Sequence, residues 1–126
     1  ILALAKSASL KNLEEIILNK NDIKDKGMQH LAASENFTKL KILKAGDVSI
    51  GDLAVKTLVL SQSLKNLEEL RLNGNNITRE GLEFLHDTLN LCALKKIDLR
   101  RNRFLYEDCI FLSDSPRFKN LEVVRF

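Results

Sequence analysis

This 126-residue sequence contains only two cysteines, Cys92 and Cys109, which is too few for the disulfide framework of a small secreted domain. It has no apolar run long enough to cross a bilayer, so we expect no membrane partner. The formal net charge is only +3, which does not by itself require an acidic partner. With 44% hydrophobic and 29% charged residues, the composition is that of an ordinary globular domain and not of a disordered chain.

Residue groups that carry catalysis or bind metals and cofactors are also missing. The two histidines, His30 and His86, fall at different positions of the repeat described below, and no cluster of cysteine and histidine has metal-ligand spacing. Gly46 and Gly51 do not form a phosphate-binding loop pattern. The sequence therefore predicts no catalytic residue, no metal and no cofactor, and a protein that is not an enzyme.

One pattern fills the chain and returns every 27 residues. In the segment Leu64–Gly81, LKNLEELRLNGNNITREG, apolar residues and an asparagine follow one another at fixed offsets: Leu67, Leu70, Leu72, Asn75 and Ile77. The first leucine recurs without insertion at Leu13, Leu40, Leu67, Leu94 and Leu121. Five copies in register are not expected by chance. We call residues that share a repeat position a column.

Each repeat divides into a strand half and a helix half. The strand half covers about six residues, for example 13–18, and the second half has apolar residues at helical spacing, as in Met28, Leu31 and Ala32. This spacing predicts helices centred near residues 30, 57, 84 and 111. Acidic residues open the helical half and favour the positive end of the helix dipole: Asp25, Asp52 and Glu80. Hydroxyl side chains mark its end: Ser7, Ser34, Ser61, Thr88 and Ser115.

A strand and a helix in every repeat predict an α/β solenoid, with a parallel inner sheet and outer helices. Strands stack at about 4.8 Å and helices at about 10 Å, so the stack must curve into a horseshoe with the sheet inside. We expect residues 1–126 to form a single domain. Because Ile1 starts within a helix and Phe126 ends within a strand, we also expect the domain to be a fragment of a longer array.

The pattern resembles the ribonuclease-inhibitor-like leucine-rich repeats, in which strand and helix alternate over about 28 residues. The turn Ile77-Thr78-Arg79-Glu80-Gly81 and the helix end Leu31-Ala32-Ala33-Ser34 are similar to those of cytoplasmic arrays common in bacteria. The resemblance implies a protein-binding module. Secreted members usually carry disulfide-bonded caps, and none is present here, so it also implies a cytoplasmic location, or a host cytoplasm for an effector.

Two repeats depart from the pattern. Val48 replaces the asparagine in the second repeat, so we expect an interruption of the side-chain ladder that this column forms. Asp108 replaces the turn glycine in the fourth repeat, and we expect the loop Phe104–Asp108 to differ in shape and to offer an alternative contact site. The columns also predict that Cys109 lies in the core and Cys92 at the surface.

The candidate binding site is the concave face of the sheet. We predict that its contact residues lie on the strands and directly after them: Lys44, Arg71, Asn73, Asp98, Arg100, Arg101 and Arg125. Basic residues outnumber Asp47 and Asp98 on this surface, which points to a partner protein with an acidic surface. Before the strands the charges alternate, and neighbouring repeats should pair them in a ladder: Glu14, Lys41, Glu68, Lys95 and Glu122. Each exposed pair contributes only about 0.2–1 kcal/mol.

The predicted function is protein binding through this concave face. The main alternative is a non-catalytic targeting or sensor part of a larger enzyme or effector. A solvated face without a ligand is the plainest interpretation of the charges, and nucleic acid is disfavoured by the low net charge and the lack of interleaved aromatic residues. We further expect end-to-end self-association, because apolar residues lie at both ends: Ile1, Leu4, Leu10, Leu121, Val124 and Phe126.

Overall fold

The computed structural model describes residues 1–126 and contains five short strands in one sheet. The strands lie side by side in sequence order, and every neighbouring pair is parallel. Equivalent residues of successive repeats face each other; Leu43, for example, is the register partner of Leu70. The strands are β1 Glu15–Ile17, β2 Ile42–Lys44, β3 Glu69–Arg71, β4 Lys96–Asp98 and β5 Val123–Arg125.

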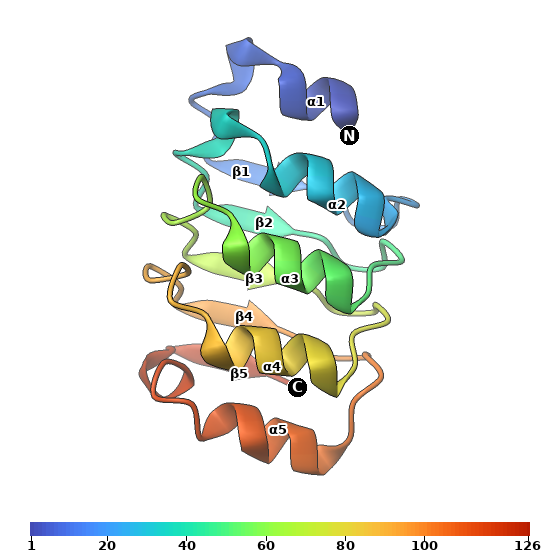
Figure 1. The fold of residues 1–126 in the computed structure, drawn as a ribbon, viewed down its shortest axis with the longest axis vertical. Helices are drawn as coiled ribbons and strands as arrows, with labels where there is room; N and C mark the ends of the chain where they lie inside the picture. Colours follow the sequence, from blue (N-terminus) through green and yellow to red (C-terminus); the bar gives the residue numbers. More distant parts are fainter.

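The helices form a second layer on one side of this sheet, and the repeats stack along the long axis of the molecule (Figure 1). The α-helices are α1 Leu2–Lys6, α2 Lys24–Ala32, α3 Asp52–Leu60, α4 Arg79–Asp87 and α5 Tyr106–Ser113. Three short 3-10 helices precede strands: η1 Ala8–Leu10, η2 Glu35–Phe37 and η3 Phe118–Asn120. The predicted strand–helix alternation is confirmed, and the helices are centred within about two residues of the predicted positions. The helices are all too short or too polar to span a bilayer.

The strands are shorter than the six residues predicted, because only three residues of each keep regular strand pairing. Backbone pairing between repeats nevertheless continues on both sides of the strand. Before it, the Lys41 N–H donates to the Glu14 carbonyl at 2.8 Å, and after it the Leu18 N–H donates to the Lys44 carbonyl at 2.8 Å. The predicted six-residue segment is therefore a three-residue strand flanked by hydrogen-bonded loops.

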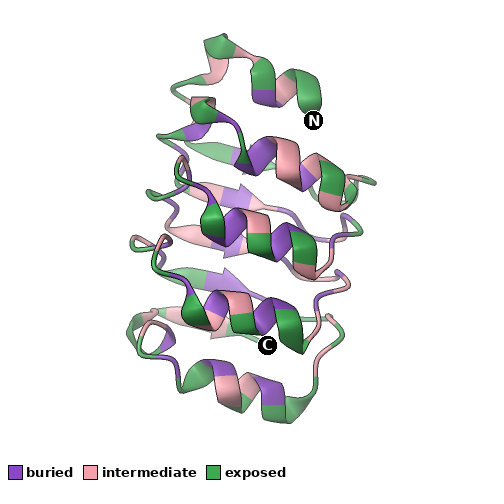
Figure 2. Ribbon diagram, in the orientation of Figure 1, coloured by how far each residue is buried: buried purple, intermediate pink, exposed green.

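The hydrophobic core lies between the sheet and the helices. The middle residue of each inner strand is buried, and each of α2 to α4 turns a buried stripe toward the sheet (Figure 2). The side chains of Phe37, Met28 and Leu70 have no exposed surface. The leucine columns found in the sequence thus supply the core, and burial of their apolar surface is the main term that stabilises the stack.

Two side-chain ladders join successive repeats. In the hydroxyl column, Ser34 Oγ donates to the Ala5 carbonyl at 2.5 Å and Ser61 Oγ donates to the Ala32 carbonyl at 2.6 Å, so each hydroxyl closes the end of the preceding helix. In the asparagine column, Asn75 Oδ1 accepts from the N–H groups of Val48 and Ile50. The Val48 side chain cannot do the same for the first repeat, so the predicted interruption is present.

Carboxylates form a third set of links at the helix N-termini. Asp25 Oδ1 accepts from the Gly51 N–H at 2.7 Å, and Asp52 Oδ1 accepts from the N–H groups of Thr78 at 2.8 Å and Gly81 at 3.0 Å. The sequence indicated a dipole effect for these residues, but it did not show that each one binds the next repeat. The 27-residue spacing of Asp25 and Asp52 thus adds a hydrogen bond from each repeat to the next.

The fourth repeat replaces this link with an ion pair. Arg79 occupies the column of Asp25 and Asp52, and its Nη1 lies 2.8 Å from Asp108 Oδ1. Asp108 Oδ2 also accepts from the Leu105 N–H at 2.8 Å, which caps α5. The hydrogen bond from Leu105 and then the bond from Arg79 lower the pKa of Asp108. The helix α5 begins at the same repeat position as α4. Its start differs from that of α4 in that Leu105 and Tyr106 are exposed there.

The two cysteines differ in exposure, and neither forms a disulfide. Cys92 is exposed, as predicted. Cys109 was predicted in the core and is only half-buried, because α5 has a neighbouring helix on one side only. Burial raises the pKa of the Cys109 thiol, and the negative charge of Asp108 raises it further.

Candidate functional site

The face of the sheet that the helices leave uncovered is the candidate site. Side chains alternate along a strand, so the middle residue of each three-residue strand points toward the helices and the other two point away. We call the surface formed by these outer positions the open face. It consists of Glu15, Ile17, Ile42, Lys44, Glu69, Arg71, Lys96, Asp98, Val123 and Arg125.

The predicted basic residues of the strands do lie on the open face, but most of them already have an acidic partner. Lys44 Nζ lies 2.6 Å from Glu15 Oε1, and Arg71 Nε lies 2.5 Å from Glu69 Oε1. Glutamates at the first strand position point to the same side as the cations at the third position. The predicted surplus of positive charge was therefore too large, because the sequence reasoning counted Asp47 and Asp98 but not these two glutamates.

Asp98 lies at the end of β4 on the open face and is buried, with 5% of its surface exposed. Arg100 holds it with two bonds, Nε to Oδ1 at 3.0 Å and Nη2 to Oδ2 at 2.6 Å. Burial alone would raise the pKa of Asp98, but the hydrogen bonds from Arg100 and the charges of Arg100 and Arg125 outweigh it and lower the pKa. The same pair raises the pKa of Arg100. Asp98 was predicted as an accessible contact residue, and this burial corrects that expectation.

Arg101 reaches across an entire repeat. Its Nη2 lies 2.9 Å from Asp47 Oδ2, over the turn of the third repeat at Gly74. A Cβ atom at Gly74 would lie 2.1 Å from Asp47 Oδ1, so only glycine leaves room for this bridge. In all four turns the residue at this repeat position has a positive φ angle, which is 60° for Lys20 and 68° for Gly74.

Asn73 is half-buried between turns and not a free contact residue. A Cβ atom added at Gly46 would lie 2.9 Å from the Asn73 side-chain amide, so the two residues are already in close contact. The Asn73 carbonyl accepts from the Asp47 N–H at 2.9 Å. Asn73 therefore helps to space the turns.

The alternating charges beside the strands form the expected ladder in part. Glu14 pairs with Lys41 at 3.1 Å, and Glu68 pairs with Lys95 at 2.7 Å. The hydrogen bond between Glu68 and Lys95, together with their opposite charges, lowers the pKa of Glu68 and raises that of Lys95. These side chains are largely solvated, so each pair contributes little to stability.

A shallow hollow of about 150 Å³ opens on the open face over β3 to β5. Lys96 and Arg125 line it, and neither forms an ion pair with a carboxylate. Arg125 was among the predicted contact residues, whereas Lys96 was missed. The sequence did contain a signal for Lys96, because this lysine occupies the repeat position that Glu15 and Glu69 hold in other repeats. No group of three or more metal-ligating side chains lies close enough together to hold an ion.

Comparisons with known proteins find a similar repeat in two parts of the chain and a similar fold. Residues 9–32 and 63–85 match a family model described as a leucine-rich repeat. The solved structure of leiomodin-1 actin-binding site 2 is similar, with a TM-score of 0.72 and 16% identity over 98% of this chain and 75% of that one. An internalin from Listeria monocytogenes matches with a TM-score of 0.55 and 23% identity over 100% of this chain and 37% of its own. No curated protein sequence matches. Both structures share the fold of alternating strands and helices.

Proposed function

We propose that this leucine-rich-repeat protein binds another protein through the open face of its sheet, and that an acidic group of the partner meets Lys96 and Arg125. Domains built from leucine-rich repeats are generally protein-interaction modules. The observation that carries the proposal is the hollow over β3 to β5, on a face that no helix covers, where Lys96 and Arg125 line the same depression and neither forms an ion pair with a carboxylate.

The other basic residues on or beside the open face have a smaller part in this proposal. Lys44, Arg71, Arg100 and Arg101 each hold a carboxylate of the chain itself, so a partner would have to displace that carboxylate before gaining the contact. Such exchanges are close to neutral in energy at a solvated surface. Lys96 and Arg125 offer a net gain.

The test starts with affinity capture on the immobilised chain, identification of the bound protein by mass spectrometry, and preparation of that protein in pure form. A Lys96→Glu/Arg125→Glu variant should then bind it at least tenfold more weakly, which corresponds to about 1.4 kcal/mol. A Lys6→Glu/Lys26→Glu variant makes the same change in charge on the helical side and should bind normally. Unchanged affinity of the first variant, or equal losses in both, would reject the open face as the site.

Four finer assignments belong to the same proposal. The alternation of strand and helix over 27 residues supports the ribonuclease-inhibitor-like class of repeat. The two free cysteines support a reducing compartment such as the cytoplasm. We take residues 1–126 as one domain, since one continuous core runs through them. In the alternative function this domain is the targeting or sensor part of a larger enzyme or effector, and assays of the full-length protein with and without it distinguish the two.

We also propose that residues 1–126 associate end to end. The support is the outer edge of β5, which pairs with β4 on one side only. The N–H groups of Ala45, Leu72 and Leu99 each donate to the next strand, and Phe126 occupies the equivalent position in the last one. Such an edge is a template for pairing with a second chain.

A further inference from the structure

Three grooves follow one another along the edge of the molecule where the helices end, and they are lined by the same columns. The first, between α2 and α3, has a volume of about 560 Å³, the second about 470 Å³ and the third about 410 Å³. The shared positions are Ala32, Ala33, Ser61 and Ser63 in the first groove, Val59, Leu60, Thr88 and Asn90 in the second, and His86, Asp87, Ser115 and Arg117 in the third. The repeat thus builds one groove at each of these junctions.

The second groove is the most apolar of the three. Leu60 and Leu89 line it and are 60% and 79% exposed, and Val59 and Phe84 complete its wall. Leu60 also lines the first groove and Leu89 the third, so each leucine separates two neighbouring grooves. Large apolar side chains that cluster at an exposed groove mark a site where another apolar group binds.

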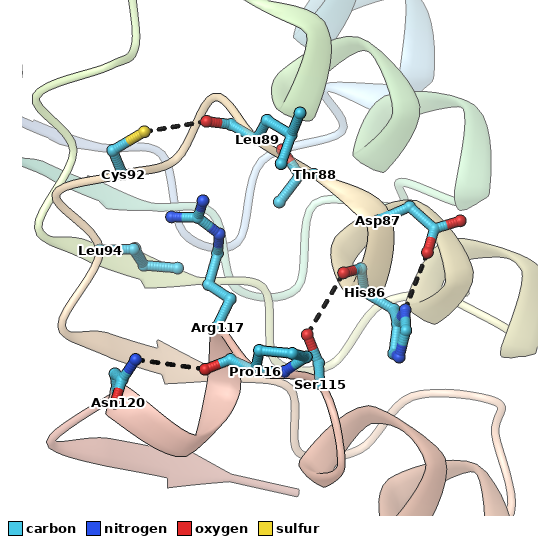
Figure 3. A pocket seen from close by; sticks show the side chains of 10 residues that line it. All are labelled: His86, Asp87, Thr88, Leu89, Cys92, Leu94, Ser115, Pro116, Arg117 and Asn120. Carbon is cyan, nitrogen blue, oxygen red and sulfur yellow. Dashed lines mark hydrogen bonds and ion pairs between the residues drawn. The ribbon is translucent and has the colours of Figure 1, made fainter.

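Each of the two end grooves contains one charged side chain without an ion-pair partner, and these two charges are opposite. In the first groove Glu35 is exposed and has no basic partner. In the third groove the Arg117 guanidinium extends toward Cys92 and Thr88, as Figure 3 shows. Its Nη1 donates to the Leu91 carbonyl at 3.3 Å, and it pairs with no carboxylate.

The charges in the middle of the row offset one another. Lys56 Nζ lies 5.5 Å from the centre of the Phe84 ring, and Asp87 lines the second groove with it. Asp87 Oδ1 in turn lies 2.8 Å from His86 Nδ1. From the first groove to the third, the row therefore presents the unpaired carboxylate of Glu35, the apolar side chains of the second groove, and Arg117, which shares the third groove with Asp87.

We propose that this row of grooves binds a peptide segment of a partner protein. An apolar side chain sits between Leu60 and Leu89, a basic side chain faces Glu35, and an acidic side chain faces Arg117. Packed helices lie about 8–10 Å apart, so neighbouring grooves are separated by about that distance. A segment in the polyproline II conformation has three residues per turn and rises about 3.1 Å per residue, so every third side chain lies on one side at about this spacing. The matching segment is Lys-x-x-Leu-x-x-Asp, in either chain direction.

The experiment uses three synthetic heptapeptides. Each has leucine at its centre and serine or glycine at the four x positions. The two end residues are Lys and Asp in the first peptide, Lys and Lys in the second, and Asp and Asp in the third. Titration into the isotope-labelled protein, followed by NMR, should shift the methyl signals of Leu60 and Leu89. The Lys-and-Asp peptide should bind at least about threefold more tightly than the other two, which is the range expected for exposed ion pairs. Arg117→Glu should transfer the preference to the Lys-and-Lys peptide, and Glu35→Lys should transfer it to the Asp-and-Asp peptide.

Two leucine variants complete the test. Leu89→Ser should remove binding, and because Leu89 is 79% exposed the fold should be retained. Leu105 is 70% exposed at the start of α5, away from the grooves, so Leu105→Ser should bind as the unchanged protein does. The proposal is overturned if no peptide shifts the two leucine signals, if Leu89→Ser still binds, or if the charge preference does not move with Arg117 and Glu35. The result is independent of binding at the open face.

Discussion

Single side chains hold successive repeats together where backbone pairing ends, and Asn75 is one of these residues. Its Oδ1 accepts from Val48 and Ile50, and its Nδ2 donates to the carbonyls of Ala45 and Leu72. Asn75 is buried, so these backbone groups have no access to water as a substitute partner. An asparagine is required here because it offers both a donor and an acceptor on one short side chain.

Asn75→Ala should therefore lower the free energy of unfolding by about 2–4 kcal/mol, since each buried polar group left without a partner costs about 1–3 kcal/mol. Asn21 is the matched control in the same column. It is exposed and bonds only to its own turn, at the carbonyls of Leu18 and Asn19. Asn21→Ala should cost about 1 kcal/mol or less. Urea unfolding followed by circular dichroism measures both, and equal losses would show that the link between repeats adds nothing.

A second prediction at this scale concerns Asp98 and pH. The lowered pKa of Asp98 means that its charged form is stabilised by folding, so its contribution is present at neutral pH. It is lost as the pH falls below the ordinary aspartate value of 3.8 and through the lower folded pKa. Asp98→Asn should cost about 1–3 kcal/mol at pH 7, and the difference from the unchanged protein should narrow at pH 3.

Asp22 provides the control for that prediction. It pairs with Lys24 at 3.0 Å, and both side chains are about two-thirds exposed, at 65% and 66%. Asp22→Asn should change the stability by about 0.5 kcal/mol or less at either pH. A loss for Asp98→Asn that is equally large at pH 3 would mean that the aspartate acts by shape and not by charge.

The sequence could predict the residue types of the ladders but not all of their partners. The asparagine and hydroxyl columns were recognisable because each column keeps one kind of side chain. The partners of Arg101 and Asn73 were not, because Asp47 lies 54 residues from Arg101 and the packing of turns depends on positive φ at Gly74. The predicted surplus of positive charge on the open face was too large for a related reason. Whether Arg71 turns to Glu69 or to solvent is a choice of rotamer that no column encodes.

Among the secondary-structure elements, helices α3 and α4 are each linked at their N-terminus to a carboxylate of the preceding repeat. Asp52 accepts from the Thr78 and Gly81 N–H groups and from Thr78 Oγ1, so α3 supplies the cap of α4. Sequence reasoning located these acidic residues, since they open each helical half. It could not show that their bonds cross to the next repeat, because that depends on how adjacent helices are staggered.

We expect Asp52→Ala to lower the free energy of unfolding by about 1–2 kcal/mol, the usual range for loss of a helix cap. The exchange of the Thr78 and Gly81 amides with solvent should also become faster. Asp25→Ala is the matched change and should cost less, because Asp25 accepts from the Gly51 N–H alone. Native-state hydrogen exchange measures the local effect. Unaltered exchange at Gly81 in the Asp52 variant would show that α4 does not depend on this cap.

The whole molecule follows from the 27-residue period, which is why the fold was predictable at that level. Once five copies are in register, parallel pairing of equivalent strands and stacking of equivalent helices leave no other arrangement of the leucine columns. Binding sites do not follow from the period in the same way. Lys96 departs from the glutamates that its column holds at Glu15 and Glu69, and Arg125 differs from Lys44 and Arg71 only in lacking an ion pair, which the structure had to show. The row of grooves likewise became visible only when the helix ends were placed in space.

The last prediction is that a polypeptide of residues 1–126 associates as its concentration rises, because the outer edge of β5 offers unpaired backbone groups. Static light scattering should show the mean mass increase between low and high micromolar protein. Phe126→Pro removes the N–H that points to this edge and should weaken the association, whereas Phe126→Leu keeps that N–H and should not. The Phe126 ring meets Phe104 edge to face at 6.4 Å, so the leucine variant also controls for the loss of this contact. A mass that stays monomeric throughout, or one that falls equally in both variants, would contradict pairing at the β5 edge.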